Sequence, residues 1–192
     1  SDGGKQWESV RSLVNTPIYG LAIAGKKAWA VGARGEILSS DDHGDSWRLQ
    51  KSGTKNHLYS VWFNDERRGW AVGVDGSILA TIDGGEHWSE QKSNLTKQLF
   101  GVAFGDDNVG VAVGAGGTLL TTNNGGGSWK AKKQNSEANF LRAFAIAPNK
   151  FWVVGTDGII SHSADGRANW TTQPSDYSSN LQSIIFINDQ LG

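Results

Sequence analysis

Short apolar segments recur along the chain, and each group of them is closed by a glycine-rich polar turn. One group begins with Leu58–Phe63, a mostly apolar run without strict alternation, which is typical of a strand buried on both faces. Trp70–Gly73 and Ser77–Thr81 follow as second and third apolar segments, and a fourth begins at Trp88 and turns polar. No stretch has the 3.6-residue apolar period of a capped helix. The pattern therefore predicts an all-β fold.

The groups repeat with a constant period along the whole chain. Tryptophans that end related hexapeptides recur at almost equal intervals, and they are Trp7, Trp47, Trp88, Trp129 and Trp170. Paired glycines advance by the same interval each time, and they are Gly32/Gly35, Gly73/Gly76, Gly114/Gly117 and Gly155/Gly158. Since the apolar runs keep the same period, three registers agree, which indicates structural repeats.

Four short strands in about 41 residues are the size of one β-propeller blade. A lone four-stranded sheet cannot bury both faces, so we expect neighbouring antiparallel sheets to stack around an axis. We predict one propeller over residues 1–192, with blades at 17–50, 57–91, 98–133 and 140–173 and partial strands at 6–11 and 180–187. The leftover strands indicate a piece of a ring of six to eight blades. Self-association that completes a ring is the alternative.

The loops at one end of the blades are the candidate binding face. The residues between paired glycines suit tight hairpins with positive φ and differ from blade to blade, whereas the scaffold around them repeats. In a propeller these turns and the loops between blades share one face, which usually carries the pocket. The residues nominated for this face are Arg34, Asp75, Asp157, Lys55, His57 and Lys97.

Net charge, hydropathy and cysteine content limit the classes of partner and cofactor that we expect. Lys and Arg number 18 against 19 Asp and Glu, so the net charge of −1 does not favour nucleic acid. No apolar run is long enough for a membrane span, so membrane insertion is not expected. There is no cysteine, and the four histidines lack the spacing of metal ligands. We therefore expect no metal and no cofactor.

The hexapeptides belong to a longer motif. Ser40–Trp47 and Thr122–Trp129 match Ser/Thr-x-Asp/Asn-x-Gly-x-Ser/Thr-Trp, and the copy that ends at Trp88 departs from it at His87. The chain thus resembles the Asp-box, or bacterial neuraminidase repeat, propellers. Its longer pattern from Gly73 to Trp88 is most similar to the photosystem II stability/assembly factor-like repeat family.

The Asp-box residues have a structural explanation. The Asp or Asn can accept hydrogen bonds from backbone N–H groups of the turn, and the Trp can anchor the hairpin in the core between blades. The residues assigned this structural role are Asp2, Trp7, Asp42, Trp47, Asp83, Trp88, Asn124, Trp129, Asp165 and Trp170.

The resemblance implies a function in protein assembly. It implies a non-enzymatic module that binds a protein partner or a complex under assembly through one propeller face. It also implies export to a periplasm, the cell exterior or a thylakoid lumen. The alternative is a sialidase-like glycoside hydrolase or a carbohydrate-binding propeller, whose partner is a glycan. Asp75 and Asp157 are the only carboxylate pair we nominate for catalysis, although ordinary Asp-Gly turns explain both. A third hypothesis is that the chain is a purely structural propeller segment of a larger surface protein.

Overall fold

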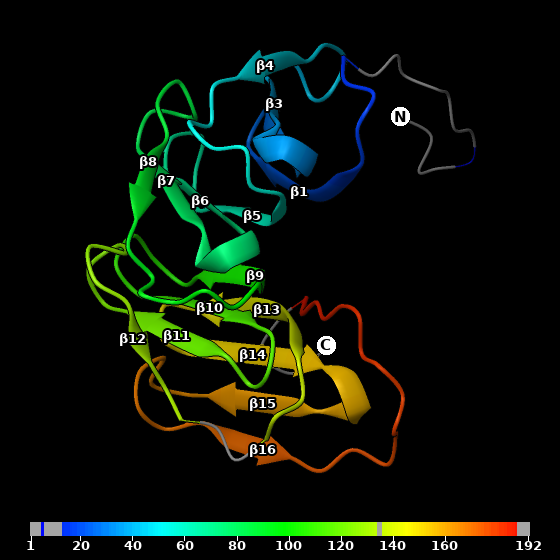
Figure 1. The fold of residues 1–192 in the computed structure, drawn as a ribbon, viewed down its shortest axis with the longest axis vertical. Helices are drawn as coiled ribbons and strands as arrows, with labels where there is room; N and C mark the ends of the chain where they lie inside the picture. The colour runs from blue at the N-terminus through cyan, green and yellow to red at the C-terminus, as the bar shows by residue number, and fades with distance from the viewer. Residues whose placement is uncertain (1–4, 6–12, 134–135, 188–192) are drawn as a thin grey trace.

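The computed structural model describes residues 5, 13–133 and 136–187, which form an arc of four antiparallel sheets (Figure 1). Blade 1 consists of β1 (Ile18–Ala24), β2 (Lys27–Gly32), β3 (Ile37–Ser40) and β4 (Arg48–Gln50). Blade 2 consists of β5 (Leu58–Phe63), β6 (Gly69–Gly73), β7 (Ile78–Thr81) and β8 (Ser89–Gln91). Blade 3 consists of β9 (Leu99–Phe104), β10 (Gly110–Gly114), β11 (Leu119–Thr122) and β12 (Lys130–Ala131). Blade 4 consists of β13 (Phe140–Ala147), β14 (Lys150–Gly155), β15 (Ile160–Ser163) and β16 (Thr171–Gln173).

Each sheet has its strands in chain order, as in a propeller blade. The first strand of every blade lies on the inner, concave side of the arc, and the fourth lies on its outer side (Figure 1). The predicted all-β fold of four-stranded antiparallel blades is confirmed. The described residues contain no α-helix, and none of their helical segments is long and apolar enough to cross a membrane.

The paired glycines close the hairpin between the second and third strands of each blade. In blade 1 the backbone N–H of Glu36 donates to the Ala33 carbonyl at 3.1 Å, and both residues between them have positive φ, 58° at Arg34 and 72° at Gly35. Two consecutive residues with positive φ define a type I′ turn, which suits the twist of a two-stranded ribbon. A side chain on Gly35 is also excluded, because a Cβ there would lie 2.2 Å from the Thr54 carbonyl oxygen.

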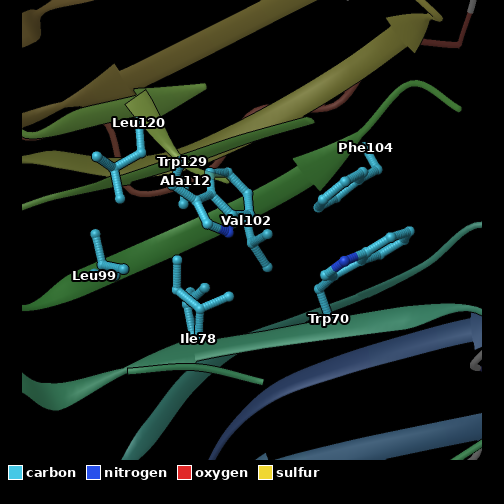
Figure 2. Close-up of a cluster of buried hydrophobic side chains, with 9 residues drawn as sticks. Trp70, Ile78, Leu99, Val102, Phe104, Ala112, Leu120 and Trp129 are labelled. Carbon is cyan, nitrogen blue, oxygen red and sulfur yellow. The ribbon is translucent and has the colours of Figure 1, made fainter. Parts of the chain in front are cut away.

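Stacked aromatic rings join neighbouring blades. Trp29 of blade 1 lies parallel to Phe63 of blade 2, with ring centroids 3.4 Å apart. Trp70 of blade 2 lies parallel to Phe104 of blade 3 at 3.5 Å, and the Trp129 ring meets the edge of this pair (Figure 2). Because each ring buries a large apolar surface on a neighbouring sheet, these contacts dominate the cores between blades.

A buried glutamine adds polar contacts at the same two interfaces. The Gly84 carbonyl of blade 2 accepts hydrogen bonds from Trp29 Nε1 at 2.9 Å and from Gln50 Nε2 at 3.0 Å. Gln50 Oε1 in turn accepts the Trp88 indole N–H at 3.2 Å. We call this arrangement the glutamine bridge. The same bridge joins blades 2 and 3 through Gly125, Trp70, Gln91 and Trp129.

The interface between blades 3 and 4 has a different apolar core. Phe104 pairs in register with Gly110, whereas the equivalent pair in blade 4 is Ala145 with Phe151. A Cβ on Gly110 would lie 2.5 Å from the Phe104 ring, so the two positions can hold only one ring between them. In blade 4 the ring has moved to the neighbouring strand, where Phe151 is fully buried. The core volume is thereby kept while the residues exchange places.

Of the two predicted partial strands, only the one at 180–187 lies within the described residues, and it is not observed as a strand. Residues 6–11, together with Asp2 and Trp7, lie outside the described residues. Residues 180–187 form no strand, because the ladder partner of each first strand is the second strand of its own blade, and none follows here in the described chain. The segment nevertheless lies against blade 4 as a first strand would. Phe186 contacts Trp152 with ring centroids 5.1 Å apart, and Leu181 N–H donates to the Gly155 carbonyl.

At the opposite end of the arc, no described residue covers one apolar sheet face. Leu21 and Ile23 of β1 are 59% and 70% exposed, whereas Val61 and Phe63, at the same ladder positions of blade 2, are 6% and 7% exposed. Trp47, expected between blades, belongs to none of the described apolar cores, and its indole N–H donates to Gly44 in its own turn. Trp88 and Trp129, by contrast, pack between blades.

Replacing Trp70 with Ala should lower the free energy of unfolding by about 3–5 kcal/mol, the usual range for truncating a buried Trp. Trp70 is 3% exposed and loses both its ring partner and its hydrogen bond to Gly125. Trp47→Ala, at the uncovered end of the arc, is the matched control and should have a clearly smaller effect. Denaturant titration of both variants measures the difference. Equal losses would contradict the assignment of the interface Trp as the main link between blades.

Candidate functional site

The variable hairpin turns lie along one rim of the arc. Arg34, Asp75 and Asp157 occupy equivalent turns in blades 1, 2 and 4, and all three are exposed. Each has positive φ between 54° and 58°. Blade 3 has Gly116 at this position, with a φ of 57°. The turns therefore present their variable side chains to solvent from a constant backbone.

The loops between blades bring further basic side chains to this rim. Lys55, His57 and Lys97 are all exposed. The Lys97 ammonium donates to the Gly116 carbonyl at 3.2 Å, which places it across the blade 3 turn. His57 immediately precedes β5, and its ring lies 6.2 Å from the Tyr19 ring. The nominated rim residues thus flank the starts of the inner strands.

A row of aromatic side chains crosses those strand starts. The rings of Tyr19 and Tyr59 are 5.4 Å apart, and those of Tyr59 and Phe100 are 5.7 Å apart. All three occupy the second position of their first strands and are partly exposed or half-buried. The sequence-based nominations missed this row, although the repeat period aligns its members.

The row lines a shallow groove that extends to Arg142 of blade 4. Arg142 Nη1 donates to the Phe100 carbonyl at 3.2 Å, which holds the guanidinium beside the last ring of the row. Within the described residues this guanidinium makes no ion pair, so its other N–H groups remain available. The hollow has a volume of about 210 Å³. We call it the inner-strand groove, and its lining residues are Tyr19, Tyr59, Phe100, Leu141, Arg142 and Gln182.

The carboxylates nominated for catalysis do not form a constellation. Asp75 and Asp157 lie in separate turns with blade 3 between them, and among the described residues neither side chain has a hydrogen-bond or ion-pair partner. A hydrolytic pair would need two carboxyl groups on opposite sides of one bond, at a separation fixed by the fold. No described contact holds the Asp75 and Asp157 carboxyl groups on opposite sides of one bond.

The Asp-boxes lie at the other end of the blades. The carboxylate or amide oxygens of their Asp or Asn side chains accept hydrogen bonds from within the same turn. Asp83 Oδ1 accepts the Thr81 hydroxyl at 2.8 Å and the His87 backbone N–H at 3.0 Å. Its Oδ2 lies 2.8 Å from His87 Nδ1. Equivalent bonds surround Asp42, Asn124 and Asp165. No group of three or more His, Asp or Glu side chains suited to a metal occurs in the described chain.

The hydrogen bonds to the box carboxylates stabilise their charged form. Donation by the Ser46 hydroxyl is the main cause that lowers the pKa of Asp42 to about 2. The backbone N–H groups of His87 and Arg167 are the main causes that lower the pKa of Asp83 and of Asp165 to about 2. Carboxylates kept ionised by a closed turn are suited to anchoring that turn and not to general acid catalysis.

The sequence matches one family model over most of this fold. The model for the photosynthesis system II assembly factor YCF48 matches residues 46–99 and 85–181. The chain belongs to the YCF48 family. No curated protein matches the sequence.

Solved structures share the fold at low sequence identity. A YCF48 bound to D1 peptide has a TM-score of 0.61 and 16% identity, with 95% of this chain and 91% of that chain covered. YCF48 from Cyanidioschyzon merolae has a TM-score of 0.58 and 16% identity, with 95% and 93% covered. An ancestral GH74 enzyme has a TM-score of 0.67 and 14% identity, and the match covers 83% of this chain and 24% of that chain. At such identities, the similarity establishes the propeller fold of this YCF48-family chain.

The Asp-boxes should make stability depend on acid. Their carboxylates have a pKa of about 2 when folded, against about 3.9 for Asp in an unfolded chain. The ionised form is therefore favoured by folding above pH 4, and its contribution is lost as the pH falls from about 4 to 2. Asp83→Asn should flatten the fall in melting temperature over this range. Asn124→Asp, which adds a titrating group to the neutral box, should steepen it, and unchanged slopes in both variants would contradict the account.

Proposed function

We propose that this chain is a non-enzymatic module that binds an extended segment of a partner protein along the inner-strand groove. The observation that carries the proposal is the continuous row of Tyr19, Tyr59 and Phe100, which ends at the Arg142 guanidinium. Contiguous aromatic side chains beside an arginine are the usual composition of the energetic centre of a protein interface.

The groove defines the chemistry of the segment that it would accept. Aromatic faces pack against apolar or aromatic side chains, and the hydroxyls of Tyr19 and Tyr59 offer polar contacts at the same surface. The guanidinium of Arg142 would pair with a carboxylate of the segment, with the geometric preference of its planar fork. The exposed cations Arg34, Lys55 and Lys97 on the rim add long-range attraction for the same charge.

The comparisons support a polypeptide as the ligand class. One of the similar YCF48 structures has a D1 peptide bound, and it covers nearly the whole of this chain. The D1 peptide is a ligand of that YCF48 structure, at 16% identity to this chain. For this chain, membership of the YCF48 family and the peptide-bound structure support a protein partner, and we propose the inner-strand groove as its binding surface.

The direct test is selection of peptides on the intact chain from a random displayed library, followed by calorimetric titration of the selected peptides. We expect selected peptides to contain an acidic residue next to apolar or aromatic ones. Tyr59→Ala, Phe100→Ala and Arg142→Gln should each weaken binding by about tenfold or more, as expected for central interface residues. Tyr177→Ala, which removes a 72% exposed tyrosine outside the groove, is the matched control and should leave binding unchanged.

Two results would overturn the proposal. Selected peptides whose affinity is unaffected by all three groove variants would place the binding surface elsewhere. Turnover of sialosides or xyloglucan by the intact chain, lost on Asp75→Asn or Asp157→Asn, would show that the module is a glycoside hydrolase.

A further inference from the structure

The outer edge of the interface between blades 3 and 4 collects positive charge. Lys130, Lys132 and Arg167 line one hollow of about 160 Å³, and no acidic side chain lines it. None of the three forms an ion pair with any described residue. Asp165, in the same Asp-box as Arg167, accepts hydrogen bonds from its own turn. Three unneutralised cations around a hollow repel one another unless an anion lies between them.

The first interface shows how this chain neutralises a cation at the same place. Arg48, equivalent to Lys130, pairs with Glu86 of the next blade at 2.5 Å and with Asp41 at 3.5 Å. Counting by the repeat period, Ala168 replaces Glu86 at the third interface and Asn123 replaces Asp41. Both acidic partners are therefore missing where the number of cations is greatest.

Two of the cations also replace the glutamine bridge. Lys132 stands where Gln50 and Gln91 stand at the other interfaces, and Arg167 stands where Gly85 and Gly126 stand. A Cβ on Gly126 would lie 1.9 Å from Gln91 Oε1, so a side chain at this position and a bridging glutamine exclude each other. The replacement of Gln by Lys132 and that of Gly by Arg167 are therefore coupled. They turn a closed polar contact into an open basic hollow.

The exchange leaves one buried donor without an acceptor. Trp88 and Trp129 donate their indole N–H groups to bridging glutamines at 3.2 Å and 3.1 Å. Trp170 occupies the equivalent position at the third interface, and its buried Nε1 has no hydrogen-bond partner among the described residues. A buried N–H without an acceptor destabilises the folded state.

We propose that this hollow binds a tetrahedral oxyanion, phosphate or sulfate. Lys130, Lys132 and Arg167 supply its counter-charge, and the hydroxyl of Ser128 and the amide of Asn123 at the rim supply neutral donors. Trp170 does not line the hollow, but the repeat places it beside Lys132, as Trp129 lies beside Gln91. The site lies on the outer, Asp-box side of the arc, away from the inner-strand groove, and it does not depend on peptide binding there.

The test follows the indole N–H resonance of Trp170, assigned by its loss in Trp170→Phe, during titration of the intact chain with inorganic phosphate or sulfate at constant ionic strength. We expect saturable movement of this resonance in millimolar phosphate and a rise in melting temperature. Sodium chloride and acetate arms at the same ionic strength should give neither effect. Effects that are equal in all four arms would reveal only screening of the cations and would overturn the proposal.

The double variant Lys132→Gln with Arg167→Gly rebuilds the glutamine bridge of the other interfaces. In this variant, phosphate affinity should fall by about tenfold or more, the factor expected from loss of charge-assisted hydrogen bonds. The melting temperature without phosphate should rise, which distinguishes loss of the site from loss of the fold. Lys51→Gln with Lys92→Gln removes the same charge from exposed positions outside the hollow and should retain phosphate binding. If both double variants bind phosphate like the original chain, the site lies elsewhere.

Discussion

The contact between sheets is the constraint from which the rest of this structure follows. Each sheet is apolar on both faces, so burial of a face against a neighbouring sheet is what stabilises it. Two of the three interfaces solve this with the same pieces, a stacked Trp and Phe and a glutamine bridge to a glycine carbonyl of the next Asp-box. The Asp-box is thereby fixed twice, by hydrogen bonds within its own turn and by the preceding blade.

The sequence predicts the repeated features well because each recurs in register. The apolar runs, the paired glycines of the hairpins and the Asp-box turns are visible as one period, and their physical roles follow from burial, positive φ and Asx-type hydrogen bonds. The period does not reveal which ring meets which. Trp29 reaches Phe63 in the first strand of the next blade, and nothing in either local segment indicates that contact.

The inner-strand groove shows the same limit at the candidate site. Turn residues such as Arg34 and Asp75 can be assigned to one rim from topology alone. Tyr19, Tyr59 and Phe100 read as ordinary members of buried strands, because an aromatic residue in an apolar run predicts burial. In the structure these rings are partly accessible, and together with Arg142 they line the inner-strand groove. A binding site predicted from the variable turns alone would therefore not have included the inner-strand groove.

At the interface between blades 3 and 4, the apolar contacts and the polar contacts have changed in different ways. Exchange of a Phe–Gly pair for Ala145 and Phe151 keeps one ring at the boundary, so the apolar core stays filled. Exchange of a Gln–Gly pair for Lys132 and Arg167 has no such compensation within the described chain, since it removes an acceptor and adds two charges. Like charges at a partly buried edge raise the free energy of the folded state. The apolar exchange is therefore complete in itself, whereas the polar exchange becomes favourable only when an anion neutralises the hollow.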